Sequence, residues 1–151
     1  IQDGNSLDMT SQLTISAWFN SNSWSTAFGN SIVTKAGNYA LRSGSTPSTA
    51  FQFIYWDGTN IRRAEITPPS TGEWHHVVGL VSGNDLSQIY VDGVSQSITP
   101  ATWFAQARDL TNPLQIGGNS SGTSDGKIDD VRVYNRALSV DEVLKLYRQG
   151  K

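Results

Sequence analysis

The chain has 151 residues, no cysteine, and a formal net charge of -2 from 11 basic and 13 acidic residues spread along its length. This length suits one domain with a full hydrophobic core, and the lack of cysteine excludes disulfides, thiolate zinc sites and a cysteine nucleophile. Because there is no basic run and no apolar stretch near the roughly 20 residues of a membrane span, we expect neither nucleic acid as a partner nor membrane insertion.

The first half of the chain alternates short apolar segments with turn residues, which is typical of antiparallel β-structure. Residues 13–20 alternate between two sets of side chains and predict a strand with Leu13, Ile15, Ala17 and Phe19 on one face. One hairpin is expected around Gly37, between strands 31–36 and 38–42. A second is expected between strands 50–57 and 61–67, because the intervening DGTN sequence is a strong turn signal.

The second half continues this pattern. After a loop at 68–72, residues 74–82 are the most apolar segment and predict a central strand. The Asp-Gly pair at 92–93 predicts a tight hairpin between strands 86–91 and 94–98. Three less regular segments follow: an irregular stretch at 99–112, a short strand at 114–117, and a glycine- and serine-rich run at 117–126 that predicts a mobile loop.

The segment 126–139 predicts a closing strand that runs directly into a helix. Alternation places Val131 and Val133 on one face and the remaining side chains, Ile128, Asp130, Arg132 and Tyr134, on the other. Ser139 and Glu142 have the spacing of a capping box, which marks the helix start. An apolar stripe then predicts that the helix docks on the sheet; its members are Val140, Val143, Leu144 and Tyr147.

About ten strands, a single helix and no alternation of strands with helices predict an all-β, two-sheet antiparallel sandwich. The residues expected to contribute to its core are Ile15, Ala17, Trp18, Trp74, Val78, Leu80, Ile89, Val91, Val131 and Val133.

Five blocks, in order along the chain, resemble the laminin-G-like jelly rolls of the concanavalin A-like lectin/glucanase superfamily. They are 6–19 (SLDMT and LTISAWF), 73–77 (EWHHV), 89–93 (IYVDG), 114–117 (LQIG) and 126–139 (GKIDDVRVYNRALS). The resemblance implies a single jelly-roll domain over 1–151 with one short C-terminal helix. It does not fix the function, since this fold hosts lectins, adhesion modules, hydrolases, lyases and spacers.

The family's usual first strand, with the pattern FDG…YV, has no counterpart here, because the sequence begins at Ile1. We therefore expect a domain excised from a larger protein. Without that strand, one edge of the closing strand would be open to pairing with another chain or with a segment of the parent protein.

Catalysis is not expected. The hydrolases of this fold place carboxylates on alternate positions of one strand, about 5 Å apart. Only three glutamates occur, Glu65, Glu73 and Glu142, and none has a carboxylate partner two residues on. The pair His75-His76 does not predict zinc either, because adjacent strand residues point to opposite faces.

Calcium is the one cofactor that the resemblance implies. The aspartate two positions before VRVY supplies a side-chain oxygen in calcium-bearing members, and that position is Asp129 here. Calcium needs six to eight oxygen ligands, and Asp3 could contribute. The alternative is that Asp129 and Asp130 only bond to loop amides or pair with Arg132 or Arg136.

Aromatic residues outside the core blocks are candidates for glycan binding, because an exposed aromatic ring can stack on the apolar face of a sugar. The candidate ligand-binding residues are Trp24, Tyr55, Trp56, Arg62 and Trp103. The alternative is that each tryptophan covers a sheet edge.

The sequence thus predicts a non-catalytic recognition or adhesion module of a secreted or cell-surface protein, extracellular in location, that binds glycan through loop aromatics. The alternative is an architectural or protein-interaction module, such as the tip of a surface fibre, with a cell-surface protein as its partner.

Overall fold

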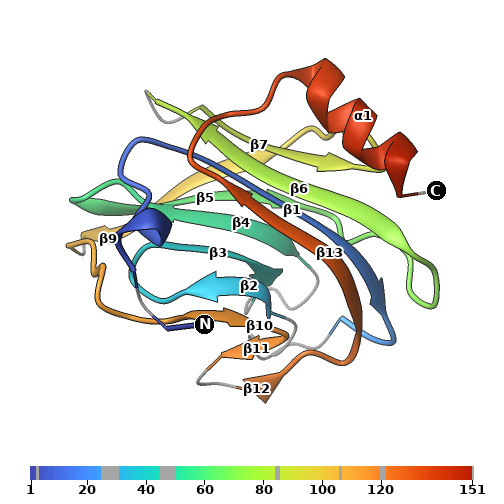
Figure 1. Cartoon of the computed structure of the whole chain (residues 1–151), viewed down its shortest axis with the longest axis horizontal. Helices are drawn as coiled ribbons and strands as arrows, with labels where there is room; N and C mark the ends of the chain where they lie inside the picture. The colour runs from blue at the N-terminus through green and yellow to red at the C-terminus, as the bar shows by residue number, and fades with distance from the viewer. Residues whose placement is uncertain are drawn as a thin grey trace.

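The computed structural model describes residues 1–2, 4–24, 31–44, 50–83, 86–105, 107–119 and 122–150; for Leu86, Trp103 and Phe104 it describes the backbone only. Two antiparallel sheets lie face to face, and one helix lies at the C-terminal end (Figure 1). This confirms the predicted jelly-roll sandwich.

The five-stranded sheet has the order β13-β1-β6-β7-β8, and the six-stranded sheet has the order β10-β2-β3-β4-β5-β9. The five-stranded sheet consists of β13 (Gly126–Tyr134), β1 (Gln12–Ser21), β6 (His75–Ser82), β7 (Leu86–Val91) and β8 (Val94–Ser95). The six-stranded sheet consists of β10 (Leu114–Ile116), β2 (Ser31–Lys35), β3 (Tyr39–Ser43), β4 (Phe51–Trp56), β5 (Asn60–Ile66) and β9 (Thr99–Ala105). The other elements are the 3-10 turn η1 (Asn5–Leu7), the small pair β11 (Gly118–Asn119) and β12 (Gly122–Thr123), and α1 (Val140–Gln149).

The three predicted hairpins are found, although the second strand of the last one is β8 at 94–95 and not 94–98, and β6 is central in its sheet. The predictions for two segments were wrong. Residues 99–105 form β9, which pairs with β5 and whose Pro100 is tolerated because β9 is an edge strand. The segment 117–126, predicted as a loop, contains β11 and β12, whose short pairing involves glycines rather than an alternating pattern.

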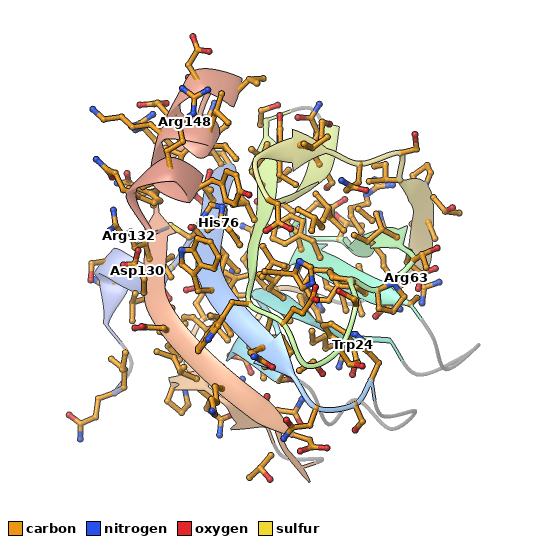
Figure 2. All side chains as sticks on the ribbon, turned by 90° about the vertical axis from the view of Figure 1, so that its right-hand side faces the viewer. Trp24, Arg63, His76, Asp130, Arg132 and Arg148 are labelled. Atoms are coloured by element: carbon orange, nitrogen blue, oxygen red, sulfur yellow. The ribbon has the colours of Figure 1, made fainter. Side chains whose placement is uncertain are left out.

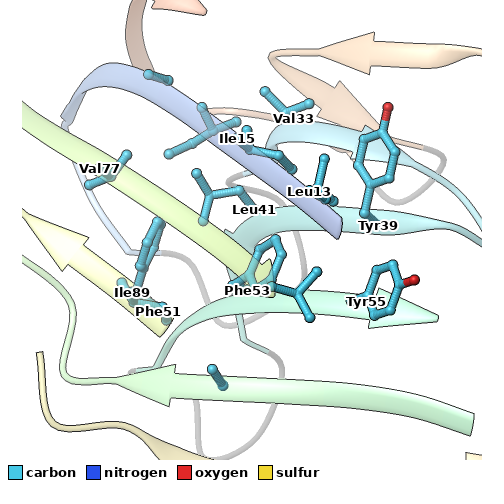
Figure 3. Packing of buried hydrophobic residues seen from close by; sticks show 14 of the residues in the cluster. Leu13, Ile15, Val33, Tyr39, Leu41, Phe51, Phe53, Tyr55, Val77 and Ile89 are labelled. Atoms are coloured by element: carbon cyan, nitrogen blue, oxygen red, sulfur yellow. The ribbon is translucent and has the colours of Figure 1, made fainter. Parts of the chain in front are cut away.

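The main core lies between the two sheets (Figure 3). Alternate residues of β1 enter it from one side, and Leu41, Phe51 and Phe53 enter it from the other. Gly79 on β6 allows this close approach, since a Cβ there would lie 2.3 Å from the Phe53 ring. Burial of these large apolar side chains is the main stabilising contribution to the fold.

A second cluster joins α1 to the outer face of the five-stranded sheet. Its buried members are Val78, Leu80, Tyr90, Leu138 and Val143. The capping box is confirmed: the Ser139 hydroxyl accepts from the Glu142 amide, and the Glu142 carboxylate accepts from the Ser139 amide. Val140, in contrast, was wrongly placed on the docking stripe. It is 57% exposed, because Leu138 already covers the sheet at this point and helix burial begins at Val143.

The closing strand β13 does not alternate as predicted. A bulge lies where the register with β1 shifts, so that Ser16 pairs with Arg132 while Trp18 pairs with Asp129. Asp130, at the bulge, has a left-handed backbone with φ of 46°. The extra residue puts Ile128 on the core side together with Val131 and Val133, although the alternation separated them.

β13 is also an edge strand, bonded to β1 alone within the described residues. No helix in the described part of the chain has the length and apolar character required to cross a membrane.

Candidate functional site

The outer face of the six-stranded sheet is not covered by α1, which packs on the other sheet. Residues Val33, Leu41 and Phe53 turn inward, so their strand neighbours turn outward. Cross-strand pairing places Gln115, Thr34, Ala40, Ile54 and Arg63 in one outward row.

A pocket of about 530 Å³ is hollowed into this face. We call it the sheet pocket; its lining residues are Thr34, Ala36, Gly37, Ala40, Arg42, Trp56, Asn112, Pro113, Gln115 and Asn119. The lining combines one tryptophan with hydroxyl, amide and guanidinium groups and contains no carboxylate. Such a set can stack on an apolar ring and exchange hydrogen bonds with hydroxyl groups.

Two polar groups of the sheet pocket have no hydrogen-bond partner among the described residues. Thr34 is 7% exposed and its Oγ1 is unbonded, and the buried Trp56 Nε1 is also unbonded. Trp56 packs on Ala40, Ile54 and Ile61, which fixes its ring at the pocket wall. Since buried polar groups are normally satisfied, this pair favours a polar ligand in the pocket.

The loop that follows β9 supplies one wall of the pocket and is held firmly. Buried Lys35 donates to the carbonyls of Leu110 (2.8 Å) and Asn112 (2.6 Å), and pairs with Asp8 at 3.2 Å. The Asn112 amide donates to the Ala36 carbonyl at 3.1 Å. These contacts fix the Asn112 side chain before any ligand binds, which reduces the entropy cost of binding.

Asp109 and Gly37 complete this support. Hydrogen bonds from the amide and hydroxyl of Thr111, and from Asn112, hold the pKa of Asp109 below its usual value. The Asp109 amide donates to the Gly37 carbonyl at 2.9 Å. Gly37 has φ of 76° and a Cβ there would lie 2.5 Å from that of Asp109, so only glycine fits.

Arg42 gives the sheet pocket its charge. Burial, and then the nearby Arg63 guanidinium, lowers the pKa of Arg42 to about 10. The group therefore remains cationic at neutral pH, and its donors can serve neutral hydroxyls or an anionic group.

The sequence-predicted ligand residues do not gather in one place. Trp56 alone lines the sheet pocket. Arg62 pairs with Asp57 at 2.7 Å and lines a separate pocket of about 340 Å³. Tyr55 is 3% exposed and lies under Arg108, whose Cζ is 5.5 Å from the ring centroid. The side chain of Trp103 lies outside the described residues.

Trp24 is not the exposed loop aromatic that the sequence suggested. Its ring packs edge-on against Phe19 (5.5 Å between centroids) and Phe51 (5.4 Å), and its Nε1 donates to the Pro69 carbonyl at 2.8 Å. The sequence around residue 24 gives no sign of this packing, because the contacting rings, Phe19 and Phe51, lie on two separate strands, β1 and β4. The packing favours a structural role.

The sequence analysis missed Thr34, Arg42, Asn112 and Gln115. The alternation of 31–36 and 38–42 already contained the signal for Thr34 and Arg42, because both are polar positions opposite an apolar face. Asn112 carries no such signal, since its place depends on how the loop between β9 and β10 folds back, whereas Gln115 lies on β10, within the short strand predicted at 114–117.

A second cavity of about 530 Å³ lies at the side of the five-stranded sheet, next to the end of α1. We call it the acidic pocket; its lining residues are Trp18, Trp74, Asp92, Asp129, Asp130, Tyr147 and Gly150. Trp74, predicted to lie in the core, is 43% exposed here, because it precedes β6 and does not take part in its alternation. Trp18 is buried as predicted, but beneath α1, where it stacks on Tyr147 at 5.8 Å.

Hydrogen bonds fix the position of Asp92 in the acidic pocket. One carboxylate oxygen accepts from the His76 amide (2.9 Å) and the other lies 2.8 Å from His75 Nδ1. His75 Nε2 in turn lies 2.8 Å from the Ser70 hydroxyl, which also reaches the Glu73 carboxylate at 3.2 Å. This connectivity is that of a Ser-His-Asp triad. Because Asp92 also binds the His76 amide, we interpret this series of hydrogen bonds as a structural link between β6 and the 92–93 turn.

The two histidines diverge, as strand geometry requires. His75 faces Ser70 and Asp92, whereas His76 is buried and lies 2.8 Å from the Ser16 hydroxyl. Burial lowers the pKa of His76 to about 4, although Asp92 and Asp130 act in the opposite direction. His76 is therefore neutral at physiological pH.

The calcium expectation concerns the same cavity. Asp129 is exposed, and its Oδ1 accepts from the Asp130 amide at 2.7 Å; Asp130 pairs with Arg132 at 2.8 Å. Within the described part of the chain, no group of three or more His, Asp or Glu side chains is close enough to hold a metal ion. Asp3 lies outside the described residues. Asp129 is thus one suitable oxygen ligand, and calcium remains a prediction.

A laminin-G family model, described as the concanavalin A-like lectin/glucanases superfamily, matches residues 1–144. The chain belongs to this superfamily. No curated protein sequence matches the chain significantly.

Several solved structures share the fold. A candidate carbohydrate-binding protein from Bacteroides ovatus is 20% identical with a TM-score of 0.72, and the match covers 95% of this chain and 42% of that one. Domain 4 of AbnA, an extracellular arabinanase from Geobacillus stearothermophilus solved with arabinotriose, is 22% identical with a TM-score of 0.62, over 97% of this chain and 70% of that one. A botulinum neurotoxin type C structure, whose description names interaction with two ganglioside molecules, is 16% identical with a TM-score of 0.61, over 95% of this chain and 37% of that one. At these identities the likeness concerns the fold, and the chain spans less than half the length of the first and third of these proteins.

Proposed function

We propose that this domain is a non-catalytic carbohydrate-binding module, and that the sheet pocket is its glycan site. The observation that carries the proposal is that Trp56 and Thr34 line the same pocket. Both line one hollow on the outer face of the six-stranded sheet, and both hold a buried polar atom that has no hydrogen-bond partner among the described residues. The described relatives support it, because a domain of the same fold was solved with arabinotriose.

The ligand class follows from the lining. A sugar ring can place its C–H face on Trp56 while its hydroxyls meet Thr34, Asn112 and Gln115. Affinity for a single site should be weak, millimolar to micromolar, because a shallow pocket buries little area and sugar hydroxyls must exchange bonds with water for bonds with protein. Useful retention would then come from several copies or sites acting together. An extracellular or cell-surface location, with a polysaccharide or cell-surface glycan as the partner, suits such a module.

The test is a glycan array followed by calorimetric titration of the best ligand. Thr34→Val is the sharpest variant, because it removes the unbonded hydroxyl and keeps the shape of the side chain. It should leave the melting temperature unchanged or raise it, since the hydroxyl makes no hydrogen bond with any described residue. Affinity should fall about three- to tenfold, the worth of roughly one hydrogen bond.

Trp56→Ala should weaken binding by at least about tenfold through loss of the ring platform. With a neutral glycan as the ligand, Trp74→Ala is the matched control, because Trp74 is an exposed tryptophan that lines the other cavity. Equal losses of affinity in the two tryptophan variants, or full affinity in Trp56→Ala, would refute the sheet pocket as the site.

One observation favours a second candidate function, that of a protein-interaction module. The outer edge of β13 is unpaired within the described residues and could add a strand from another chain or from the parent protein. The bulge at Asp130 and the charged side chain of Lys127 oppose this pairing, as they do at protected sheet edges. Glycan binding is therefore the better supported function.

A further inference from the structure

The acidic pocket has a charge pattern opposite to that of the sheet pocket. Its lining includes the carboxylates of Asp92, Asp129 and Asp130, and no cationic side chain is among the described residues that line it. Arg132 lies beside it and pairs with Asp130 at 2.8 Å. Figure 2 shows Asp130, Arg132 and His76 together near α1, while Arg63 lies on the other sheet. The two cavities therefore lie on different faces of the sandwich.

The shape of this carboxylate set favours an organic cation over a metal ion. All three aspartates line one cavity of about 530 Å³, yet the described residues contain no group of three acidic or histidine side chains close enough to hold a metal. A positive charge carried by a larger molecule can interact with dispersed carboxylates, whereas a bare cation needs ligands at about 2.3–2.6 Å.

The aromatic residues narrow the class of cation further. Trp18 is only 8% exposed and its ring stacks on Tyr147, so its face is already occupied. Trp74, at 43% exposed, is the most exposed aromatic residue among the described residues that line the cavity. Cages for trimethylammonium groups need several free aromatic faces around the cation. One open ring beside carboxylates instead suits a flat sugar ring that carries an amino group.

A further polar group in this cavity is unsatisfied. Trp18 lines the pocket while more than nine-tenths buried, and its Nε1 has no hydrogen-bond partner among the described residues. Gly150 lies against this nitrogen, since a Cβ on Gly150 would be 2.1 Å away. Because buried polar groups are normally bonded, this donor favours a polar ligand at the cavity.

We propose that the acidic pocket is a second glycan subsite, specific for an amino sugar with a free, protonated amine. The apolar face of the sugar packs on Trp74 and its ammonium group lies among the carboxylates of Asp92 and Asp130. Asp92 is held ready by His75 and the His76 amide, so it needs no reorganisation on binding. This inference rests on the proposed glycan-binding function and adds to it a ligand class and a site.

The test uses two oligosaccharides with the same backbone: a β-1,4-linked glucosamine tetramer and its fully N-acetylated form. Acetylation removes the charge of each amine while the sugar rings stay the same. Titration at pH 6 and low salt should show binding of the glucosamine tetramer and at least about tenfold weaker binding of the acetylated one, because a charge-assisted hydrogen bond is lost. Raising the salt concentration should weaken only the first interaction.

Three variants locate the site. Trp74→Ala should weaken glucosamine binding about tenfold, and Asp130→Asn about threefold, since a partly exposed ion pair is worth little. Asp141→Asn is the matched control, because it removes the same charge from an exposed helix residue outside the cavity. Asp130→Gly serves as a second variant, since glycine accepts the left-handed backbone at this position.

Equal affinity for the two tetramers would overturn the proposal, and so would an equal effect of Asp141→Asn and Asp130→Asn. Binding that needs added calcium would also overturn it, since the carboxylates would then serve a metal. If neutral glycans bind through Trp56 while the glucosamine tetramer does not bind, the amino-sugar subsite fails and the proposed function stands. If glucosamine binding depends on Trp74 and no neutral glycan binds at Trp56, the sheet pocket fails instead.

Discussion

Replacement of Trp24 tests whether this tryptophan belongs to the scaffold or to a ligand site. Its ring makes edge-on contacts with Phe19 and Phe51, and its Nε1 bonds to the Pro69 carbonyl. Each aromatic pair is worth about 0.5–1.5 kcal/mol, and the hydrogen bond about as much. Trp24→Ala should therefore lower the free energy of unfolding by about 2–4 kcal/mol, and the melting temperature by roughly 5–15 °C for a domain of this size.

The assay is urea denaturation followed by circular dichroism, with a thermal melt as a second measure. Trp24→Phe is the control, because it keeps an aromatic edge against Phe19 and Phe51 and loses the bond to Pro69; it should lose only about 1 kcal/mol from the bond. Glycan affinity, measured well below the melting temperature, should be unchanged in both variants. A change in stability below about 0.5 kcal/mol, together with loss of glycan binding, would refute the structural reading and restore Trp24 as a ligand residue.

Two further predictions concern pH and calcium. Burial lowers the pKa of His76 to about 4, whereas an unfolded histidine titrates near 6.5, so the unfolded chain binds the proton more readily. The free energy of unfolding should therefore be highest above pH 6.5 and fall by up to about 3 kcal/mol as the pH drops to 4. In His76→Gln the free energy of unfolding should not show this fall between pH 6.5 and 4. An identical pH dependence in both proteins would show that another group is responsible. If calcium binds at Asp129, adding it should raise the melting temperature and Asp129→Ala should abolish the increase; an unchanged melting temperature with and without chelator would argue against the site.

The fold was predictable because local signals and pattern agreed. The turn at 92–93, the capping box of Ser139 and Glu142, and the alternation in 13–20 each have a local physical cause, and each is found where predicted. β9 was missed because its sequence contains Pro100 and lacks alternation, and an edge strand needs neither an apolar face nor every amide.

The site was less predictable, because pockets form between segments distant in sequence. Trp24 and Trp74 show this in opposite ways. Trp24, predicted to be an exposed loop aromatic, packs on the core through Phe19 and Phe51, whereas Trp74, predicted to lie in the core, is exposed in a cavity completed by the C-terminal helix. Which tryptophan faces solvent is decided by tertiary contacts that no local window contains.

Asp92 and Asp130 of the acidic pocket share an unusual backbone conformation, but their hydrogen bonds differ. Asp92 (φ 53°) and Asp130 (φ 46°) are the non-glycine residues with positive φ in the described part of the chain, and both line this pocket. A left-handed backbone costs about 1–2 kcal/mol for most residues, and somewhat less for aspartate. For Asp92 the bonds to His75 and the His76 amide offset this cost.

For Asp130 no comparable set of bonds among the described residues offsets the cost of the left-handed backbone. Its carboxylate makes one ion pair with Arg132, both side chains being 39% exposed, and such a pair contributes little to stability. Glycine would adopt the same bulge without strain, although it would lose more entropy on folding. Asp130→Gly should thus leave the free energy of unfolding within about 1 kcal/mol of the parent protein, or raise it. If it also weakens glucosamine binding, the carboxylate at 130 serves the ligand and not the fold. A large loss of stability would mean instead that the Arg132 pair holds the bulge, and the case for Asp130 as a ligand residue would then rest on Asp130→Asn alone.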